Sequence, residues 1–219
     1  MSAKTSMDVA QYFHELGHEI IVACPTPSRN VSKAEADAKV ASMSPPFLVK
    51  RLFAISSRKS GFLSRFVENI SYGISLLLFL LKQRKVDIVY ANVWPVFSLG
   101  LLVLACKIKG IRVVASIQDL YPESLAAQKR LNSERAIYKL LFFLDSFIAR
   151  QCDRIIVISD GFKTSYTQGR GINEDKITVI RNWVKSNQVT VMDKAAARTQ
   201  LAEQASIFLS EDDVVCVYG

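Results

Sequence analysis

The chain has 219 residues, half of them apolar and 22% charged, which is enough for one packed core and part of a second domain. Lysine and arginine outnumber aspartate and glutamate by 28 to 20, giving a formal charge of +8 that favours an anionic partner such as a phosphate-bearing substrate or a membrane surface. The basic residues are scattered and form no recognised nucleic-acid motif, so nucleic acid is not expected as a partner.

Apolar residues recur with the periods of helices and strands along most of the chain. The N-terminal part predicts a helix at 7–16 that ends at Gly17, a buried strand at 18–24, a loop or weak helix at 25–46, a strand at 47–55 and a long helix at 62–85. The remainder predicts strands at 86–92, 111–117, 153–159, 176–182 and 212–219, and helices at 96–110, 134–152, 160–168 and 195–205. Strands rich in Val and Ile that alternate with helices predict an α/β fold with a doubly wound parallel sheet.

The two ends of the sequence do not follow the usual order of such a fold. A doubly wound domain normally begins with a strand, whereas this chain begins with a helix and ends on the strand at 212–219. We therefore expect truncation at both ends, with a domain at 1–190 that lacks its first strand and a linker and opening strand of a second domain at 191–219. The sheet is expected to be interrupted beside the strand at 18–24, which would leave the isolated chain marginally stable.

Polar and aromatic residues gather where the predicted strands end. Ligands of open α/β sheets bind beyond the carboxyl ends of the strands. Amides, hydroxyls, carboxylates and rings suit a sugar, whose hydroxyls need donors and acceptors and whose C–H faces pack on rings. Some of these residues have alternative roles in turns and caps, Ser159 as a helix cap above all. The candidate ligand-binding residues are Asn92, Trp94, Gln118, Asp119, Tyr121, Glu123, Ser124, Ser159, Asn182 and Trp183.

The long helix at 62–85 contains the apolar run ISLLLFLL, which is shorter than the ~20 residues that span a bilayer. One interpretation is a helix buried against the sheet. The alternative is a helix whose outer side rests on lipid, with Arg51, Arg58, Lys59 and Arg65 near anionic headgroups. The segment 140–150 could contribute to the same surface.

Several familiar motifs are absent or broken. HELGH at 14–18 matches the zinc-protease pattern, but Gly17 separates the two histidines and a strand follows, so no metal site is expected. The sequence has neither a dinucleotide-binding nor a P-loop glycine pattern, and it lacks the serine-hydrolase elbow. The four cysteines are far apart, and they and the polar N-terminus favour a cytoplasmic protein.

Five segments of the sequence are informative when they are taken together. They are ELGHEIIVAC at 15–24, VDIVYANVWPVF at 86–97, IRVVASIQDLYPESL at 111–125, CDRIIVISDGFKTSY at 152–166 and KITVIRNWV at 176–184. In this order they resemble the N-terminal half of family 4 glycosyltransferases, and within that family the WbuB-like enzymes of bacterial polysaccharide and O-antigen (lipopolysaccharide) assembly. The more specific pieces are QDLYPES at 118–124 and RNWV at 181–184.

The resemblance implies a GT-B architecture of two Rossmann-like domains and a retaining sugar transfer from a nucleotide-sugar co-substrate, with no cofactor and no metal. It implies that the N-terminal domain receives the acceptor, often a lipid-linked saccharide at the cytoplasmic face of the inner membrane, where the protein would be peripheral. The family's first strand, its Gly-rich loop and its donor-binding domain have no counterpart in this sequence. The chain alone is therefore expected to be inactive.

Gln118 stands in the loop where many family members carry a histidine that contacts the transferred sugar. Gln118 and Asp119 are the catalytic candidates, and with Glu123 they are expected at the sugar-facing rim. Asn92 and Trp94 are expected on the acceptor side, and Asn182 with Trp183 near the hinge. The alternative function is a non-catalytic domain, derived from such an enzyme, that binds a membrane surface or acts as a scaffold.

Overall fold

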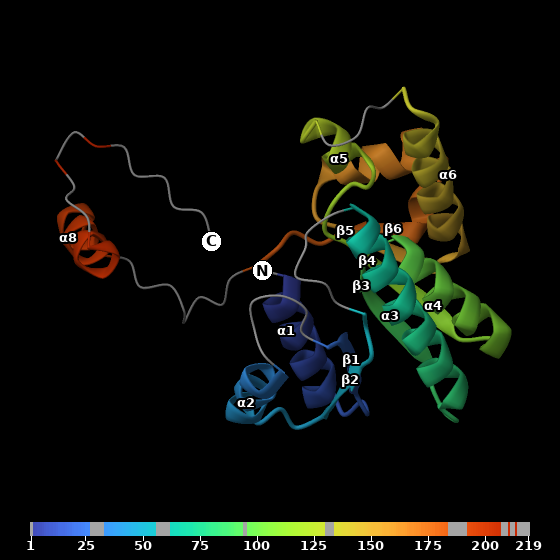
Figure 1. Cartoon of the computed structure of the whole chain (residues 1–219), viewed down its shortest axis with the longest axis horizontal. Coiled ribbons are helices and arrows are strands. Elements are labelled where there is room, and N and C mark those ends of the chain that lie inside the picture. The colour runs from blue at the N-terminus through green and yellow to red at the C-terminus, as the bar shows by residue number, and fades with distance from the viewer. Residues whose placement is uncertain are drawn as a thin grey trace. The chain divides into compact units, whose positions relative to one another are not determined.

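The computed structural model describes residues 2–26, 33–55, 62–93, 96–129, 134–183, 192–206, 210 and 213 (Figure 1). Along the sequence, the chain divides into two compact units between Arg181 and Asn182. The first unit, Ser2–Arg181, contains all the strands and most of the helices that the structure describes. The second contains helix α8 (Lys194–Ala205), whose first backbone N–H groups donate to the carboxylate of Asp193.

The N-terminal elements are α1 (Ser2–Glu15), β1 (Ile21–Pro25), α2 (Lys33–Met43) and β2 (Leu48–Leu52). β1 and β2 pair in parallel, with Ile21 opposite Leu48. The turn after α1 is formed by Gly17, whose φ of 90° suits glycine best. Of the predicted loop and weak helix, the structure has a helix at Lys33–Met43, because its alanines, lysines and Glu35 are good helix formers and the prolines lie outside it.

The remaining elements of this unit form a four-stranded parallel sheet in the order β3-β4-β5-β6. This confirms the predicted α/β fold, in which helices connect parallel strands. The strands are β3 (Ile88–Val93), β4 (Arg112–Ile117), β5 (Arg154–Val157) and β6 (Ile177–Val179). The helices are α3 (Phe62–Lys82), α4 (Val96–Lys109), α5 (Glu123–Ala127), α6 (Ala136–Gln151) and α7 (Asp160–Thr164), and α7 continues into a π-helical turn at Ser165–Gly169.

The described strands form two sheets rather than one. β1 pairs with β2, β3 pairs with β4, and no strand among the described residues joins β1 to β3. The break lies between the β1–β2 pair and the four-stranded sheet, and the expectation that β1 borders it stays a prediction. The predicted strand at 212–219 falls outside the described residues, except for Asp213.

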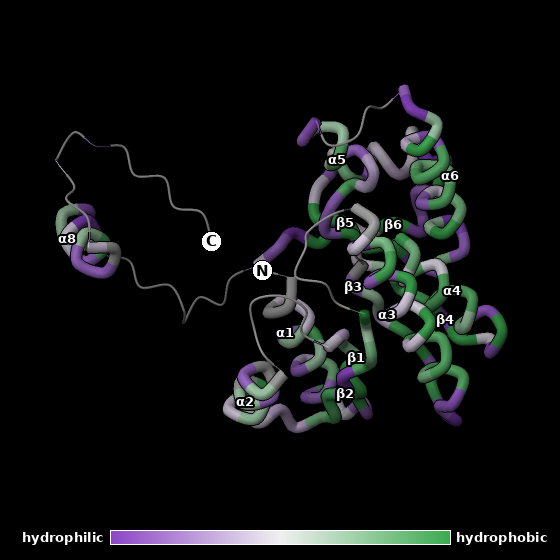
Figure 2. The backbone as a smooth tube through the Cα atoms, viewed as in Figure 1, coloured by the Kyte–Doolittle hydropathy of each residue, from purple (hydrophilic) through white to green (hydrophobic). Residues whose placement is uncertain are grey.

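The helices α3, α4 and α6 form one layer, with α4 in the middle (Figure 1). α3 and α4 approach closely at Gly73, where a β-carbon would lie 2.8 Å from Leu101 Cδ1. The hydroxyl of Ser98 donates to the carbonyl of Asn69 at 2.7 Å across the same contact. The core between this layer and the four-stranded sheet includes Leu76, Leu80, Leu102, Val103, Cys106, Val113, Ile155 and Val157. Figure 2 shows hydrophobic residues along most of α3, α4 and α6.

Candidate functional site

The carboxyl ends of all four strands of the larger sheet lie in one row. Val93 is opposite Ile117, Ile117 is opposite Val157, and Val157 is opposite Val179. Each of these residues is the last of its strand. The segments that follow β3 to β6 therefore leave the sheet at the same edge, which is the edge where open α/β sheets bind ligands. We call this the strand-end edge.

Asn92 and Gln118 lie close together at this edge. Asn92 pairs with Ser116 in the parallel register, and Gln118 lies two residues beyond Ser116, so the three side chains share one face of the sheet. The Nε2 of Gln118 donates to the buried Oγ of Ser116 at 3.1 Å. The Nδ2 of Asn92 donates to the hydroxyl of Ser6 on α1 at 2.6 Å. These bonds fix both amides in place.

The segment after β4 contains two polar side chains, those of Asp119 and Ser124, that make no hydrogen bond to the described residues. Asp119 is exposed, and its carboxylate has no hydrogen-bond or ion-pair partner among the described residues. The Oγ of Ser124 is buried and likewise lacks a hydrogen-bond partner in the described part of the chain. Because buried hydroxyls are normally satisfied, this one is a candidate partner for a ligand or a water molecule.

Glu123 is occupied by a protein partner, in contrast to its expected position at the sugar-facing rim. The guanidinium of Arg170 binds both carboxylate oxygens, with Nη1 2.8 Å from Oε1 and Nη2 2.9 Å from Oε2. Arg170 is 1% exposed, so this pair lies largely out of water. The Glu123 carboxylate is therefore bound to the fold rather than presented to a sugar.

Arg170 joins three further parts of the structure. Its Nε donates to Asp145 Oδ2 on α6 at 2.7 Å, and its Nη2 donates to the carbonyl of Tyr121 at 2.9 Å. Its guanidinium carbon lies 4.7 Å from the ring centre of Phe142 and 4.4 Å from that of Tyr166. Although burial alone would lower it, the pKa of Arg170 is raised by the hydrogen bond to Glu123 and the charge of Asp145, so the side chain remains cationic.

Arg170 thus holds the loop that carries Gln118 and Asp119 against α6 and the turn after α7. Sequence reasoning missed this residue. Its partners Glu123 and Asp145 precede it by 47 and 25 residues, and no local pattern links them. The one local signal is Gly171, whose φ of 63° marks a turn beside it.

The other predicted site residues are placed differently. Ser159 is the N-cap of α7, where its Oγ accepts from the backbone N–H of Phe162 at 3.3 Å. Asn182 and Trp183 are exposed and belong to the second unit. Trp94 lies outside the described residues. The structure therefore places Asn92, Gln118 and Asp119 at the strand-end edge. Tyr121 and Ser124 lie in the segment that follows β4, and Glu123 in the same segment faces Arg170.

The histidines of HELGH do not share a helix. α1 ends at Glu15, and the two rings contact different aromatic residues, His14 beside Phe47 and His18 beside Phe13. Among the described residues, no group of three His, Cys, Asp or Glu side chains is suited to hold a metal ion.

Comparison with known proteins agrees with the fold described above. The profile of Glycosyltransferase Family 4 matches residues 3–188. Two solved structures of Anabaena Alr3699/HepE are similar, the complex with UDP-glucose at 14% identity and a TM-score of 0.58, and the complex with UDP and glucose at 14% and 0.60. A glycosyltransferase from Rickettsia africae ESF-5 is similar at 17% identity and a TM-score of 0.51.

In each of these comparisons the match covers 94% of this chain and 46% of the solved chain. The sequence thus spans about half the length of the structures that it resembles. At these identities the likeness concerns the fold, which is that of GT-B glycosyltransferases. No curated protein matches the sequence. Because the family profile covers most of the sequence, the chain belongs to Glycosyltransferase Family 4.

Proposed function

We propose that this chain is the acceptor-side half of a retaining glycosyltransferase of the WbuB-like kind. The reaction would move a sugar from a nucleotide-sugar donor to a lipid-linked or saccharide acceptor during synthesis of bacterial cell-surface polysaccharide such as O-antigen. Neither a metal nor a cofactor is part of the proposal. Membership of the family supports the reaction class, and the UDP-glucose bound in the Anabaena structure supports a nucleotide-sugar donor.

The observation that carries this proposal is the placement of Asn92, Gln118 and Asp119 at the strand-end edge of a family 4 chain. The unpaired Asp119 carboxylate would accept hydrogen bonds from sugar hydroxyls, and an ionised acceptor makes stronger bonds than a neutral one. The bond from Gln118 to Ser116 uses one of its two N–H groups, so the amide would be held ready for a sugar. These groups orient an acceptor, which is one requirement for transfer.

A two-part experiment tests this proposal on the purified 219-residue chain. Saturation-transfer NMR with saccharides and a panel of sugar nucleotides should detect saccharide binding, and a complete lack of binding would contradict the acceptor-side role. A turnover assay with the same donors should detect no transfer by this chain alone, because the leaving diphosphate also needs stabilisation. Measurable turnover would show that the chain is more than an acceptor half.

A second candidate function is a non-catalytic domain that binds a membrane surface. The exposed apolar residues and basic side chains of α3, α4 and α6 favour this alternative. It predicts binding to anionic vesicles with no binding of saccharides, so the NMR experiment separates the two. Under either function we propose a cytoplasmic protein, peripheral on the inner membrane.

A further inference from the structure

The layer of α3, α4 and α6 carries apolar side chains on the side that faces away from the sheet. On α6, Leu140, Phe143 and Phe147 are 55%, 60% and 51% exposed. Their spacing of three and four residues places them on one helix face, opposite the buried Asp145 and Ala149. Phe143 and Phe147 stack, with ring centres 6.5 Å apart.

The neighbouring helices repeat this arrangement. On α3, the exposed residues Ile74, Leu78 and Leu81 lie opposite the buried Leu76 and Leu80. On α4, Leu104 and Ile108 are exposed and lie one turn apart. Because α3 and α6 both pack against α4, these side chains form one surface, which we call the outer helix face.

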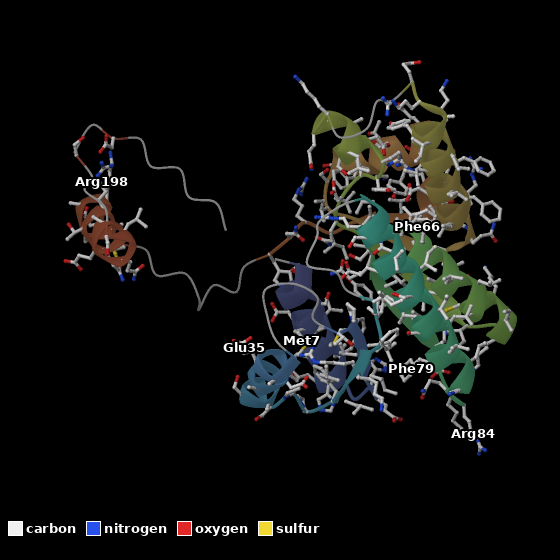
Figure 3. The ribbon with its side chains drawn as sticks, viewed as in Figure 1. Met7, Glu35, Phe66, Phe79, Arg84 and Arg198 are labelled. Carbon is white, nitrogen blue, oxygen red and sulfur yellow. The ribbon has the colours of Figure 1, made fainter. Side chains whose placement is uncertain are left out.

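The charges around the outer helix face are mostly positive. α3, α4 and α6 contain six basic and two acidic residues, and the acidic Asp145 is buried against Arg170. Lys82, Lys107 and Lys139 are exposed, and Arg84 projects away from the end of α3 (Figure 3). An apolar face bordered by basic side chains is typical of proteins that rest on anionic lipid.

We infer that the outer helix face docks on the surface of an anionic bilayer. A second copy of the chain fits less well, because pairing through this face would bring two positively charged borders together. α3 is, among the described residues, the one helix that is long and apolar enough to cross a membrane. Its close contact with α4 at Gly73 and its buried Leu76 and Leu80 instead place it flat in the layer.

Both the acyl chains and the negative headgroups of the lipid would contact the outer helix face. Phe143, Phe147 and Leu78 would reach the boundary between headgroups and acyl chains, while Lys107 and Lys139 would pair with lipid phosphates. This inference names the surface through which the protein would bind the membrane, as proposed above. It does not depend on sugar transfer. A chain that binds lipid but no saccharide would therefore leave it intact.

Flotation of the purified chain with phosphatidylglycerol–phosphatidylcholine vesicles tests the inference. The chain should float with these vesicles, bind pure phosphatidylcholine weakly and dissociate as salt rises. The double variant Phe143→Ser/Phe147→Ser should bind at least about tenfold more weakly. Phe53→Ser is the matched control, because Phe53 is 67% exposed but lies outside α3, α4 and α6, and it should bind like the wild type.

A second variant keeps the test decisive if the aromatic variant folds poorly. Lys107→Gln/Lys139→Gln should weaken binding by about fivefold for each charge removed. The inference is overturned if the wild type ignores anionic vesicles at low salt, or if both double variants bind as well as the wild type. It is also overturned if sedimentation shows a dimer that Phe143→Ser/Phe147→Ser converts to monomers, because a second copy would then cover this face.

Discussion

Arg170 and Glu123 form a two-point ion pair, although 47 residues separate them in the sequence. Through this pair and the bond to the Tyr121 carbonyl, the turn after α7 holds the loop that follows β4. That loop carries Asp119, whose carboxylate has no partner among the residues that the structure describes. The position of Asp119 therefore depends on a buried cation that binds Glu123, Asp145 and the Tyr121 carbonyl rather than Asp119 itself.

Arg170→Met should destabilise the protein strongly. The substitution leaves the buried Asp145 and the half-buried Glu123 without their cation, and such losses cost about 3–5 kcal/mol. The free energy of unfolding from urea denaturation measures the effect. Arg181→Met is the control, because the Arg181–Asp160 pair is exposed and should contribute at most about 1 kcal/mol. Similar losses in both variants would contradict the central role of Arg170.

Gly73→Ala should loosen the contact between α3 and α4. The added methyl group would lie 2.8 Å from Leu101 Cδ1 and 3.0 Å from the Ser98 backbone, and overpacking of this kind costs about 1–3 kcal/mol. Gly169→Ala provides the comparison, because the described residues leave open space around its position. Thermal unfolding of the two variants should show a lower melting temperature for Gly73→Ala alone. Equal melting temperatures would mean that the helices separate easily.

The buried thiols should give a pH-dependent stability. Burial raises the pKa of Cys106 to about 11 and that of Cys152 to about 12. The unfolded chain ionises these thiols first, at a pKa of about 8.5, so their contribution is complete below that pH and is lost as the pH rises toward 12. The free energy of unfolding should fall over this range, and less steeply in Cys152→Ala. An unchanged slope in that variant would contradict the account.

The same burial predicts the order in which the thiols react. Cys106 and Cys152 are fully buried, whereas Cys24 is half-buried beside Arg51. Mass spectrometry after brief iodoacetamide treatment should find Cys24 alkylated before Cys106 and Cys152, which should react only when urea is added. Early modification of Cys152 would show that the core around α6 opens readily.

Much of the fold could be predicted because its signals are local. The Val-rich and Ile-rich strands, Gly17 and Gly110 at helix ends, and the apolar periodicity of α3 and α6 are all visible within short windows of sequence. The order of the predicted elements also indicated an interrupted sheet, and the described strands do form two sheets. The helix at α2 was underestimated, because its polar surroundings and nearby prolines concealed good helix formers.

The candidate site could be predicted only in part. Positions at the ends of strands are readable from sequence, so the neighbourhood of Asn92, Gln118 and Asp119 was foreseen. The engagement of Glu123 was not, since it depends on Arg170, which reaches it only in the folded protein. The sugar-binding roles of these residues remain predictions, as do those of Trp94, Asn182 and Trp183.

The affinity of a saccharide ligand for Asp119→Asn and for Asp175→Asn tests the central claim most directly. Both carboxylates are exposed, but Asp119 follows β4 at the strand-end edge, whereas Asp175 precedes β6 at the opposite edge. Loss of a charge-assisted bond of about 2 kcal/mol should weaken binding to Asp119→Asn about thirtyfold and leave Asp175→Asn unchanged. Equal affinities for the wild type and both variants would show that sugars do not bind at the carboxyl ends of this sheet.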